Sequence, residues 1–79
     1  MDPQTRIVKV LQKVTGKEIA PGADEPLFTS GLLDSFALTD FVGGLEEEFG
    51  VTIPDSDLSA RKFDTIQRVD TYLATKLAR

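Results

Sequence analysis

The sequence predicts an all-α fold: a small four-helix bundle of three main helices and one short helix, with a long loop between helices 1 and 2. Apolar residues recur with helical spacing in three segments, and no segment keeps the alternation of a β-strand for long. Prolines and glycines separate these segments. With 79 residues, the chain suits one domain over residues 1–79. A small helical bundle without internal repeats is therefore expected.

The first helix is expected from about Gln4 to Thr15. Asp2 followed by Pro3 is typical of a helix start, because aspartate caps free backbone amides and proline is accepted in the first turn. Gly16 can end the helix in a left-handed conformation. The apolar face has the spacing i, i+3, i+4, i+7 and consists of Ile7, Val10, Leu11 and Val14.

Residues 17–34 show no helical period and are interrupted by two prolines and two glycines. A connection of this length in a small domain usually carries function or has packing of its own. Its apolar residues are enough to lay it over a helical core: Ile19, Leu27, Phe28, Leu32 and Leu33.

The second helix is expected to start near Asp34 or Ser35 and to end near Phe49, where Gly50 supplies the exit. A glycine in a helix costs about 1 kcal/mol relative to alanine, so the pair at positions 43 and 44 conflicts with this assignment. The pair either permits the close approach of another backbone or a cargo chain, or marks a locally weak helix. The expected buried stripe is Leu38, Phe41, Val42, Leu45 and Phe49.

The C-terminal third is expected to begin with an extended stretch at residues 51–54, because the residue before a proline is biased away from helix. One short turn of helix is expected near residues 56–60, and the last helix at about residues 65–78. Asp64 and Gln67 form a capping-box-like pair at its start. The apolar face of this last helix is Ile66, Val69, Tyr72, Leu73 and Leu77.

The composition excludes most self-contained catalytic sites. The chain has no cysteine, histidine or tryptophan, so it offers no disulfide, no thiolate metal site and no histidine base for its serines. Asp55 and Asp57 have the spacing of the start of a calcium loop, but the later ligands are missing, so no metal site is expected. Any chemistry at this protein therefore needs a reactive group from elsewhere.

The charge is unevenly distributed, with a formal net charge of −4. No basic residue lies between Lys17 and Arg61, and this stretch holds most of the acidic residues. Such an acidic segment repels nucleic acid and anionic membranes and attracts basic protein surfaces. The alternative is that it only aids solubility. Without an apolar run of membrane length or a signal-peptide pattern, we expect a soluble cytoplasmic protein with no nucleic-acid partner and no membrane span.

Residues 31–36 hold the most informative pattern, because they place Ser35 at the expected start of the second helix. Unpaired N–H groups and the helix dipole favour an anion there, and a phosphate ester on this serine fits such a site. Asp34 extends the acidic surface beside it. The alternative is that the Asp-Ser pair is simply a helix cap.

Three segments together resemble the acyl carrier protein family, which includes the peptidyl and D-alanyl carriers. Residues 27–36 resemble the attachment motif of that family. Residues 45–54 resemble the end of its second helix and the following loop, and residues 63–67 resemble the start of its last helix. The three segments occur in the right order and spacing, and the resemblance covers nearly the whole chain.

The resemblance implies that Ser35 carries 4'-phosphopantetheine, transferred from coenzyme A by a phosphopantetheinyl transferase, with Asp34 in the flanking position. It implies a monomeric, non-enzymatic carrier that receives thioester cargo from an acyl- or aminoacyl-activating enzyme and delivers it to a downstream acyltransferase or synthase. Many members have glycine where this chain has Leu32, with Gly31 one position further back. That variant resembles stand-alone carriers of the D-alanyl and secondary-metabolic kind, and it leaves the cargo open.

Partner docking is assigned to four residues. Asp40, Glu47 and Glu48 fall off the apolar stripe, where acidic side chains can steer basic partner surfaces. The resemblance also implies surface contact by Phe36, whose aromatic side chain would equally suit the core. The alternatives are ordinary solvated surface for the acids, and for the whole chain a helical protein-interaction module or, with little support, a small enzyme.

Overall fold

Asp2 and Pro3 open the first helix, α1 (Pro3–Thr15), in the computed structural model, which describes residues 2–77. The Asp2 carboxylate accepts a hydrogen bond of 2.7 Å from the Thr5 N–H. Gly16 ends the helix with a left-handed φ of 70°. Both expected signals are confirmed, and the helix begins one residue earlier than Gln4.

Helix α2 (Ser35–Phe49) has the expected bounds. The Asp34 carboxylate caps its start by accepting a hydrogen bond of 2.7 Å from the Ala37 N–H, and Gly50 closes its end with a φ of 67°. The predicted stripe is buried except for Leu38, which is half-buried.

The segment after α2 forms two short helical pieces where the sequence predicted one near residues 56–60. The first is a 3-10 turn, η1 (Asp55–Asp57), and the second is helix α3 (Ala60–Phe63). Ser59 separates them because its backbone is extended, with φ −151° and ψ 150°, and its side chain accepts a hydrogen bond from the Lys62 N–H. The prediction was therefore wrong about position: Ser59 caps a second helix and lies outside both pieces.

Helix α4 (Ile66–Leu77) follows, and the expected residue 78 lies outside the described part of the chain. The predicted capping box of Asp64 and Gln67 was wrong. The Thr65 hydroxyl caps the helix instead, accepting a hydrogen bond of 3.0 Å from the Arg68 N–H. The Asp64 carboxylate instead accepts a hydrogen bond from the Phe28 N–H in the long loop, 36 residues away in the sequence.

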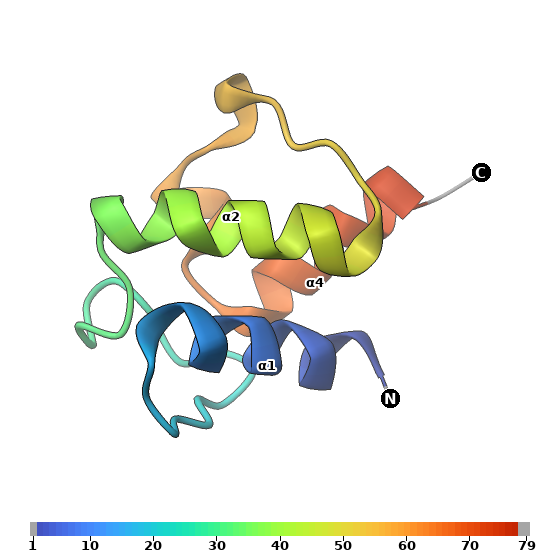
Figure 1. Cartoon of the computed structure of the whole chain (residues 1–79). Coiled ribbons are helices and arrows are strands. Elements are labelled where there is room, and N and C mark those ends of the chain that lie inside the picture. The colour runs from blue at the N-terminus through green and yellow to red at the C-terminus, as the bar shows by residue number, and fades with distance from the viewer. Residues whose placement is uncertain (1, 78–79) are drawn as a thin grey trace.

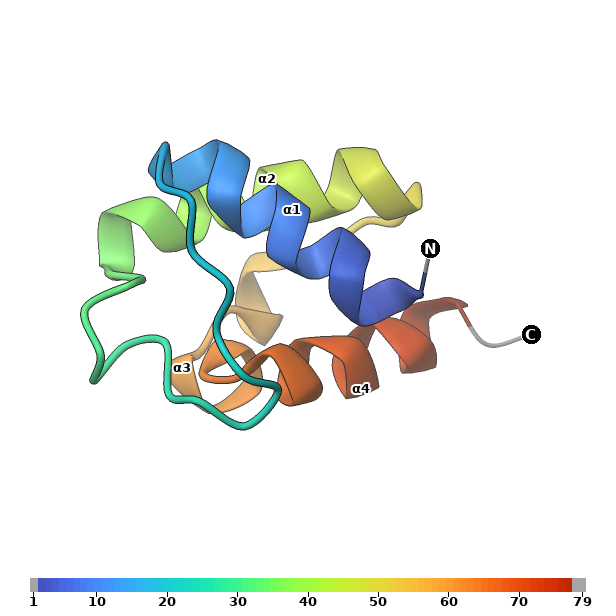
Figure 2. The same ribbon diagram turned by 90° about the horizontal axis from the view of Figure 1, so that it is seen from below.

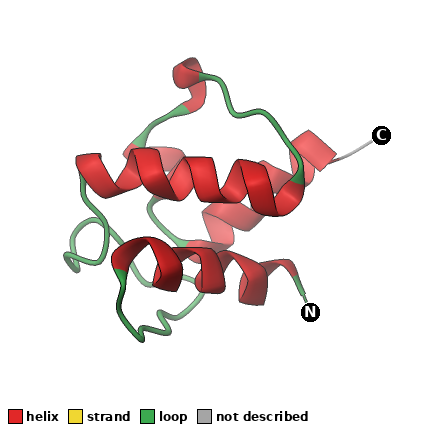
Figure 3. Ribbon diagram, viewed as in Figure 1, coloured by secondary structure: helices red, strands yellow, loops and turns green. Residues whose placement is uncertain are grey.

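The helices pack with α1 against both α2 and α4, while α3 packs on α4 (Figures 1 and 2). Residues 2–77 contain helices and loops and no strand, which confirms the all-α prediction (Figure 3). The largest fully buried side chains come from every helix except η1 and from the long loop: Ile7, Leu11, Leu27, Leu33, Phe41, Leu45, Phe63, Ile66, Val69 and Leu73.

The long loop of residues 16–34 is fixed to the bundle, as expected from its apolar residues. Leu27 and Leu33 are buried in the core. The Leu27 N–H donates to the Asp64 carbonyl, and the Gln67 N–H donates to the Ala23 carbonyl at 2.8 Å. These bonds hold the loop against the α3–α4 junction, where Figure 2 shows it passing on its way to the start of α2.

The two glycines within α2 have different roles. A Cβ atom on Gly44 would lie 2.7 Å from Cγ1 of Val10, so this glycine permits the close approach of α1. A Cβ atom on Gly43 would meet nothing within 4 Å. Gly44 therefore permits a close approach, as expected, but the neighbour is a side chain of α1 and not the backbone or cargo chain that the sequence suggested.

Candidate functional site

Ser35 is the first residue of α2, and its side chain is exposed. Its hydroxyl makes no hydrogen bond to any residue in the described range 2–77. The capping role belongs to Asp34, which bonds the Ala37 N–H. The Asp-Ser pair therefore does contain a helix cap, which is Asp34, and the Ser35 hydroxyl takes no part in it.

The turn before α2 fixes the place of this hydroxyl. The Leu33 N–H donates to the Leu27 carbonyl at 3.0 Å, and the Gly31 N–H donates to the Phe28 carbonyl at 3.1 Å. Gly31 has a φ of 81°, a conformation that other residues rarely adopt. Since Leu27 and Leu33 are both core residues, this turn presents Ser35 to solvent from a rigid base.

The electrostatics at the start of α2 suit a phosphate ester. The first N–H groups of a helix have no intrahelical acceptor, and the helix dipole adds partial positive charge at this end. The Asp34 side chain bonds one of these groups, that of Ala37, and the N–H groups of Ser35 and Phe36 have no acceptor among the described residues. A phosphate joined to the Ser35 oxygen would lie beside these donors, so the residues fit a phosphate-linked arm.

Phe36 is 86% exposed, although it is a large aromatic residue next to Ser35. The alternative that it belongs to the core is therefore wrong. A lone exposed phenylalanine beside a free hydroxyl offers an apolar contact to whatever approaches that hydroxyl.

The acidic residues of α2 differ in their contacts. Asp40 and Glu47 are exposed and have no ion-pair partner among residues 2–77. Glu48 is bound to Arg6 of α1: the guanidinium Nε lies 2.8 Å from Oε2, and the guanidinium also donates to the Glu48 carbonyl. Glu46 is half-buried and accepts a hydrogen bond from the Ile53 N–H. Asp40 and Glu47 are thus the freer acids on this helix.

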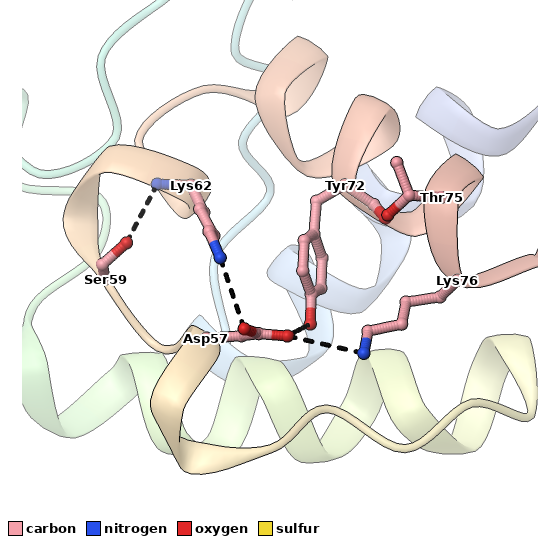
Figure 4. A network of polar contacts seen from close by, with 6 residues as sticks. All are labelled: Asp57, Ser59, Lys62, Tyr72, Thr75 and Lys76. Carbon is pink, nitrogen blue, oxygen red and sulfur yellow. Dashed lines mark hydrogen bonds and ion pairs between the residues drawn. The ribbon is translucent and has the colours of Figure 1, made fainter.

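A polar network centred on Asp57 lies between η1, α3 and α4 (Figure 4). The carboxylate accepts a hydrogen bond of 2.5 Å from the Tyr72 hydroxyl and lies 3.3 Å from Nζ of Lys62 and 3.4 Å from Nζ of Lys76. The bond from Tyr72, aided by both lysines, lowers the pKa of Asp57. Burial, together with the Asp57 carboxylate, raises the pKa of Tyr72 well above its ordinary value.

This network joins elements without forming a reactive site, because its charges are paired with one another. Within residues 2–77, no group of three or more acidic side chains could hold a metal ion. No described helix has both the length and the apolar character needed to cross a membrane. Ser35 therefore remains the best candidate for covalent chemistry in the described part of the chain.

Known protein families identify the class of this chain. The family model described as "Phosphopantetheine attachment site" matches residues 5–73. The chain therefore belongs to the phosphopantetheine-binding carrier proteins, and the resemblance seen in its sequence is confirmed. As a member, it holds acyl or aminoacyl groups on a covalently attached 4'-phosphopantetheine arm.

The chain is similar to D-alanyl carrier proteins of several bacteria. The chain is 32% identical to the D-alanyl carrier protein of Leuconostoc mesenteroides over 69 residues, which cover 87% of this chain and 88% of the relative. It is 32% identical to the D-alanyl carrier protein of Lactobacillus delbrueckii over 65 residues, which cover 82% of this chain and 81% of the relative. For that of Lactobacillus acidophilus the identity is 29% over 69 residues, covering 87% of each chain.

Proposed function

We propose that Ser35 is the residue that carries the 4'-phosphopantetheine arm, and that residues 1–79 act as one carrier domain. The observation that carries this proposal is the exposed, unbonded hydroxyl of Ser35 directly after the capping Asp34. Transfer from coenzyme A would join the phosphate to this oxygen and release adenosine 3',5'-bisphosphate. The long loop, fixed at Leu27 and Leu33, holds the oxygen within reach of the transferase.

The bound arm supplies a thiol that holds cargo as a thioester, which is activated for acyl transfer. The chain's own residues hold and present it: the Ser35 oxygen forms the phosphate ester, and the first amides of α2 favour its negative charge. Asp34 fixes the start of the helix from which the arm extends. The chain has no histidine or cysteine for catalysis, so we assign the carrier no enzymatic activity of its own.

The proposed partners are a phosphopantetheinyl transferase, an acyl- or aminoacyl-activating enzyme and a downstream acyltransferase or synthase, all meeting a monomeric carrier in the cytoplasm. Phe36 provides an apolar contact beside the arm, while Asp40 and Glu47 steer basic partner surfaces. Glu48 is a weaker docking residue than the sequence suggested, because a partner must compete with Arg6 for its carboxylate.

Aminoacyl groups are the first cargo class to test. The similar proteins named above are D-alanyl carrier proteins, and Leu32 departs from the glycine found at this position in many family members. Incubation of the modified chain with an amino-acid-activating enzyme, ATP and D-alanine, followed by intact mass spectrometry, tests this class. Loading of a fatty acyl group in place of D-alanine would assign a different cargo.

The test of the attachment site is intact mass after incubation with coenzyme A and a phosphopantetheinyl transferase. Wild type is expected to gain one phosphopantetheine and Ser35→Ala to gain none. Ser56→Ala is the matched control, because Ser56 is also exposed and also has an unbonded side chain within the described residues. A wild type left bare by several competent transferases would favour the helical interaction module.

A further inference from the structure

An open hollow of about 930 Å³ lies along α4. Its lining residues come from η1, α3, the junction between α3 and α4, α4 and the long loop, and none comes from α1 or α2. It therefore includes neither Ser35 nor any proposed docking residue of α2. Its charged lining residues are Asp24, Asp57, Arg61, Lys62, Arg68 and Lys76.

The charge of this hollow is opposite to that of the chain. Four cationic and two anionic side chains line it, an excess of two positive charges in a protein with a formal net charge of −4. The sequence order explains this contrast, because no basic residue lies between Lys17 and Arg61 and the four cations of the hollow follow that gap. The surface around α4 is thus a basic region in an acidic protein.

Two of the four cations are free to bind a partner. Lys62 and Lys76 are held by Asp57, at 3.3 and 3.4 Å. Arg61 and Arg68 are exposed, and neither forms an ion pair with a described residue. One guanidinium nitrogen of Arg68 donates to the Arg61 carbonyl at 3.1 Å, which holds this side chain over the end of α3. The Arg68 guanidinium therefore lies beside the backbone of Arg61.

The remaining lining of the hollow is polar and able to form hydrogen bonds. Gln67, Thr71 and Thr75 are exposed there and follow one another at intervals of four residues, on one face of α4. Guanidinium groups bind carboxylates through two parallel hydrogen bonds, and hydroxyl and amide groups can complete the contacts of such a ligand. The Asp57 network lies on the opposite wall. The Thr75 hydroxyl already donates to the Tyr72 carbonyl and can only accept from a ligand, so the free donors come from Arg61, Gln67, Thr71 and the remaining N–H groups of Arg68.

We propose that this hollow is a second docking surface, which binds an acidic segment of a partner protein through carboxylates placed on Arg61 and Arg68. A concave surface of this volume fits a protein segment, whereas a membrane presents a broad flat surface. The acidic stretch of residues 18–57 would be repelled by an anionic membrane and by nucleic acid. Since the hollow includes no residue of α2, a partner bound there leaves the start of α2 accessible.

The test uses the full chain, with and without its arm, and a short fluorescent peptide of alternating Glu and Ser. A peptide of Gln and Ser is the uncharged control. The double variant R61E/R68E is expected to weaken binding about tenfold, the effect of losing exposed ion pairs and adding repulsion. The matched control is K9E/K17E, which makes the same change in net charge at two exposed lysines outside the hollow. Binding by this control is expected to stay within about twofold of wild type.

Further measurements locate the contact and guard against misfolding. Backbone amide shifts in the NMR spectrum are expected to change at Arg61, Arg68, Thr71 and Thr75 on peptide addition. R61Q/R68Q, which removes charge without reversing it, should weaken binding less than R61E/R68E while keeping a native spectrum. Both variants are expected to accept phosphopantetheine at the wild-type rate.

The proposal is overturned if the two double variants weaken peptide binding equally, since net charge alone would then explain the effect. Shift changes confined to α1, or no binding at low salt, would also overturn it. A third binding experiment uses vesicles that contain phosphatidylserine. Binding to them that depends on Arg61 and Arg68, without peptide binding, would assign the hollow to a membrane instead.

Discussion

The start of α2 and the Asp57 network are both polar regions at helix ends, but they are organised in opposite ways. At the start of α2, Asp34 satisfies the helix and leaves the Ser35 hydroxyl exposed and unbonded among the described residues. In the network, Asp57 is bound by the Tyr72 hydroxyl and by two lysines. A carrier needs a hydroxyl that is held in place but not engaged, and only the first region provides one.

The difference also separates function from stability. Polar groups that bond one another contribute to folding and are not free to react, whereas a free group adjacent to a cap can be altered at little cost. Changes at Ser35 should therefore affect loading and leave stability unchanged, and changes in the network should affect stability and leave loading unchanged.

Ser35→Ala is expected to abolish loading, because no other hydroxyl occupies the start of α2. Its free energy of unfolding should stay within about 0.5 kcal/mol of wild type, as is usual for surface substitutions away from special features. Asp57→Asn should show the reverse pattern, with wild-type loading and reduced stability. Intact mass and urea unfolding check both variants, and global unfolding of Ser35→Ala would show that the residue is structural.

Asp34→Ala is expected to reduce the free energy of unfolding by about 0.5–2 kcal/mol, the usual cost of losing a helix cap. The lost contact is the 2.7 Å bond to the Ala37 N–H. Asp34→Asn is the matched control, because asparagine also caps helices and should retain most of the stability. Urea unfolding measures both. Equal losses in the two variants would show that the negative charge matters more than the cap.

Glu47→Lys is expected to weaken partner docking by about 0.2–1 kcal/mol at low salt, the range for an exposed ion pair, and to have less effect at high salt. Glu48→Lys should instead lower stability, because it replaces the partner of Arg6. Transfer rates across a salt series, paired with urea unfolding, compare the two. A transfer rate for Glu47→Lys equal to wild type at every salt concentration would remove Glu47 from the docking surface.

The pH dependence of stability is the smallest expected effect and lies in the network. The pKa of Asp57 is lowered in the folded state from its ordinary value of 3.8, so its contribution is present above about pH 4 and is lost as the pH falls through the folded pKa. The pKa of Tyr72 is raised from 10.0, so its contribution is present below about pH 10 and is lost as the pH rises further.

Tyr72→Phe tests the loss of stability at low pH and the loss at high pH in one variant. Its stability deficit relative to wild type should be largest between about pH 4 and pH 10 and should shrink on either side. Urea unfolding at a series of pH values measures this difference. A deficit that does not change with pH would mean that the Tyr72 hydroxyl does not stabilise the fold through its bond to the ionised Asp57.

The bounds of α1 and α2 could be predicted from the sequence because their signals are local. Asp2, Gly16, Asp34 and Gly50 act within a few residues of the helix ends that they define. The same applies to Ser35, whose place follows from the start of α2. The freedom of its hydroxyl could not be predicted, because Asp and Ser are both good caps and only the structure shows that Asp34 takes the role.

The remaining features depend on contacts between distant residues. Asp64 was taken for a cap, but the long loop uses its carboxylate and carbonyl, and Thr65 caps α4. Asp57 and Tyr72 are 15 residues apart, and no short-range pattern joins them. Phe63 is a core residue in a helix too short to show a period. Such contacts follow from the packing of the whole bundle.

The central claim is that the arm is attached to the Ser35 oxygen. Peptide mapping by mass spectrometry, on chain produced together with a competent phosphopantetheinyl transferase, tests it most directly. The expected result is a single modified peptide with the added group on Ser35 and none on Ser30, Ser56 or Ser59. The account would be contradicted by an arm located on another residue, or by Ser35 remaining bare in every preparation.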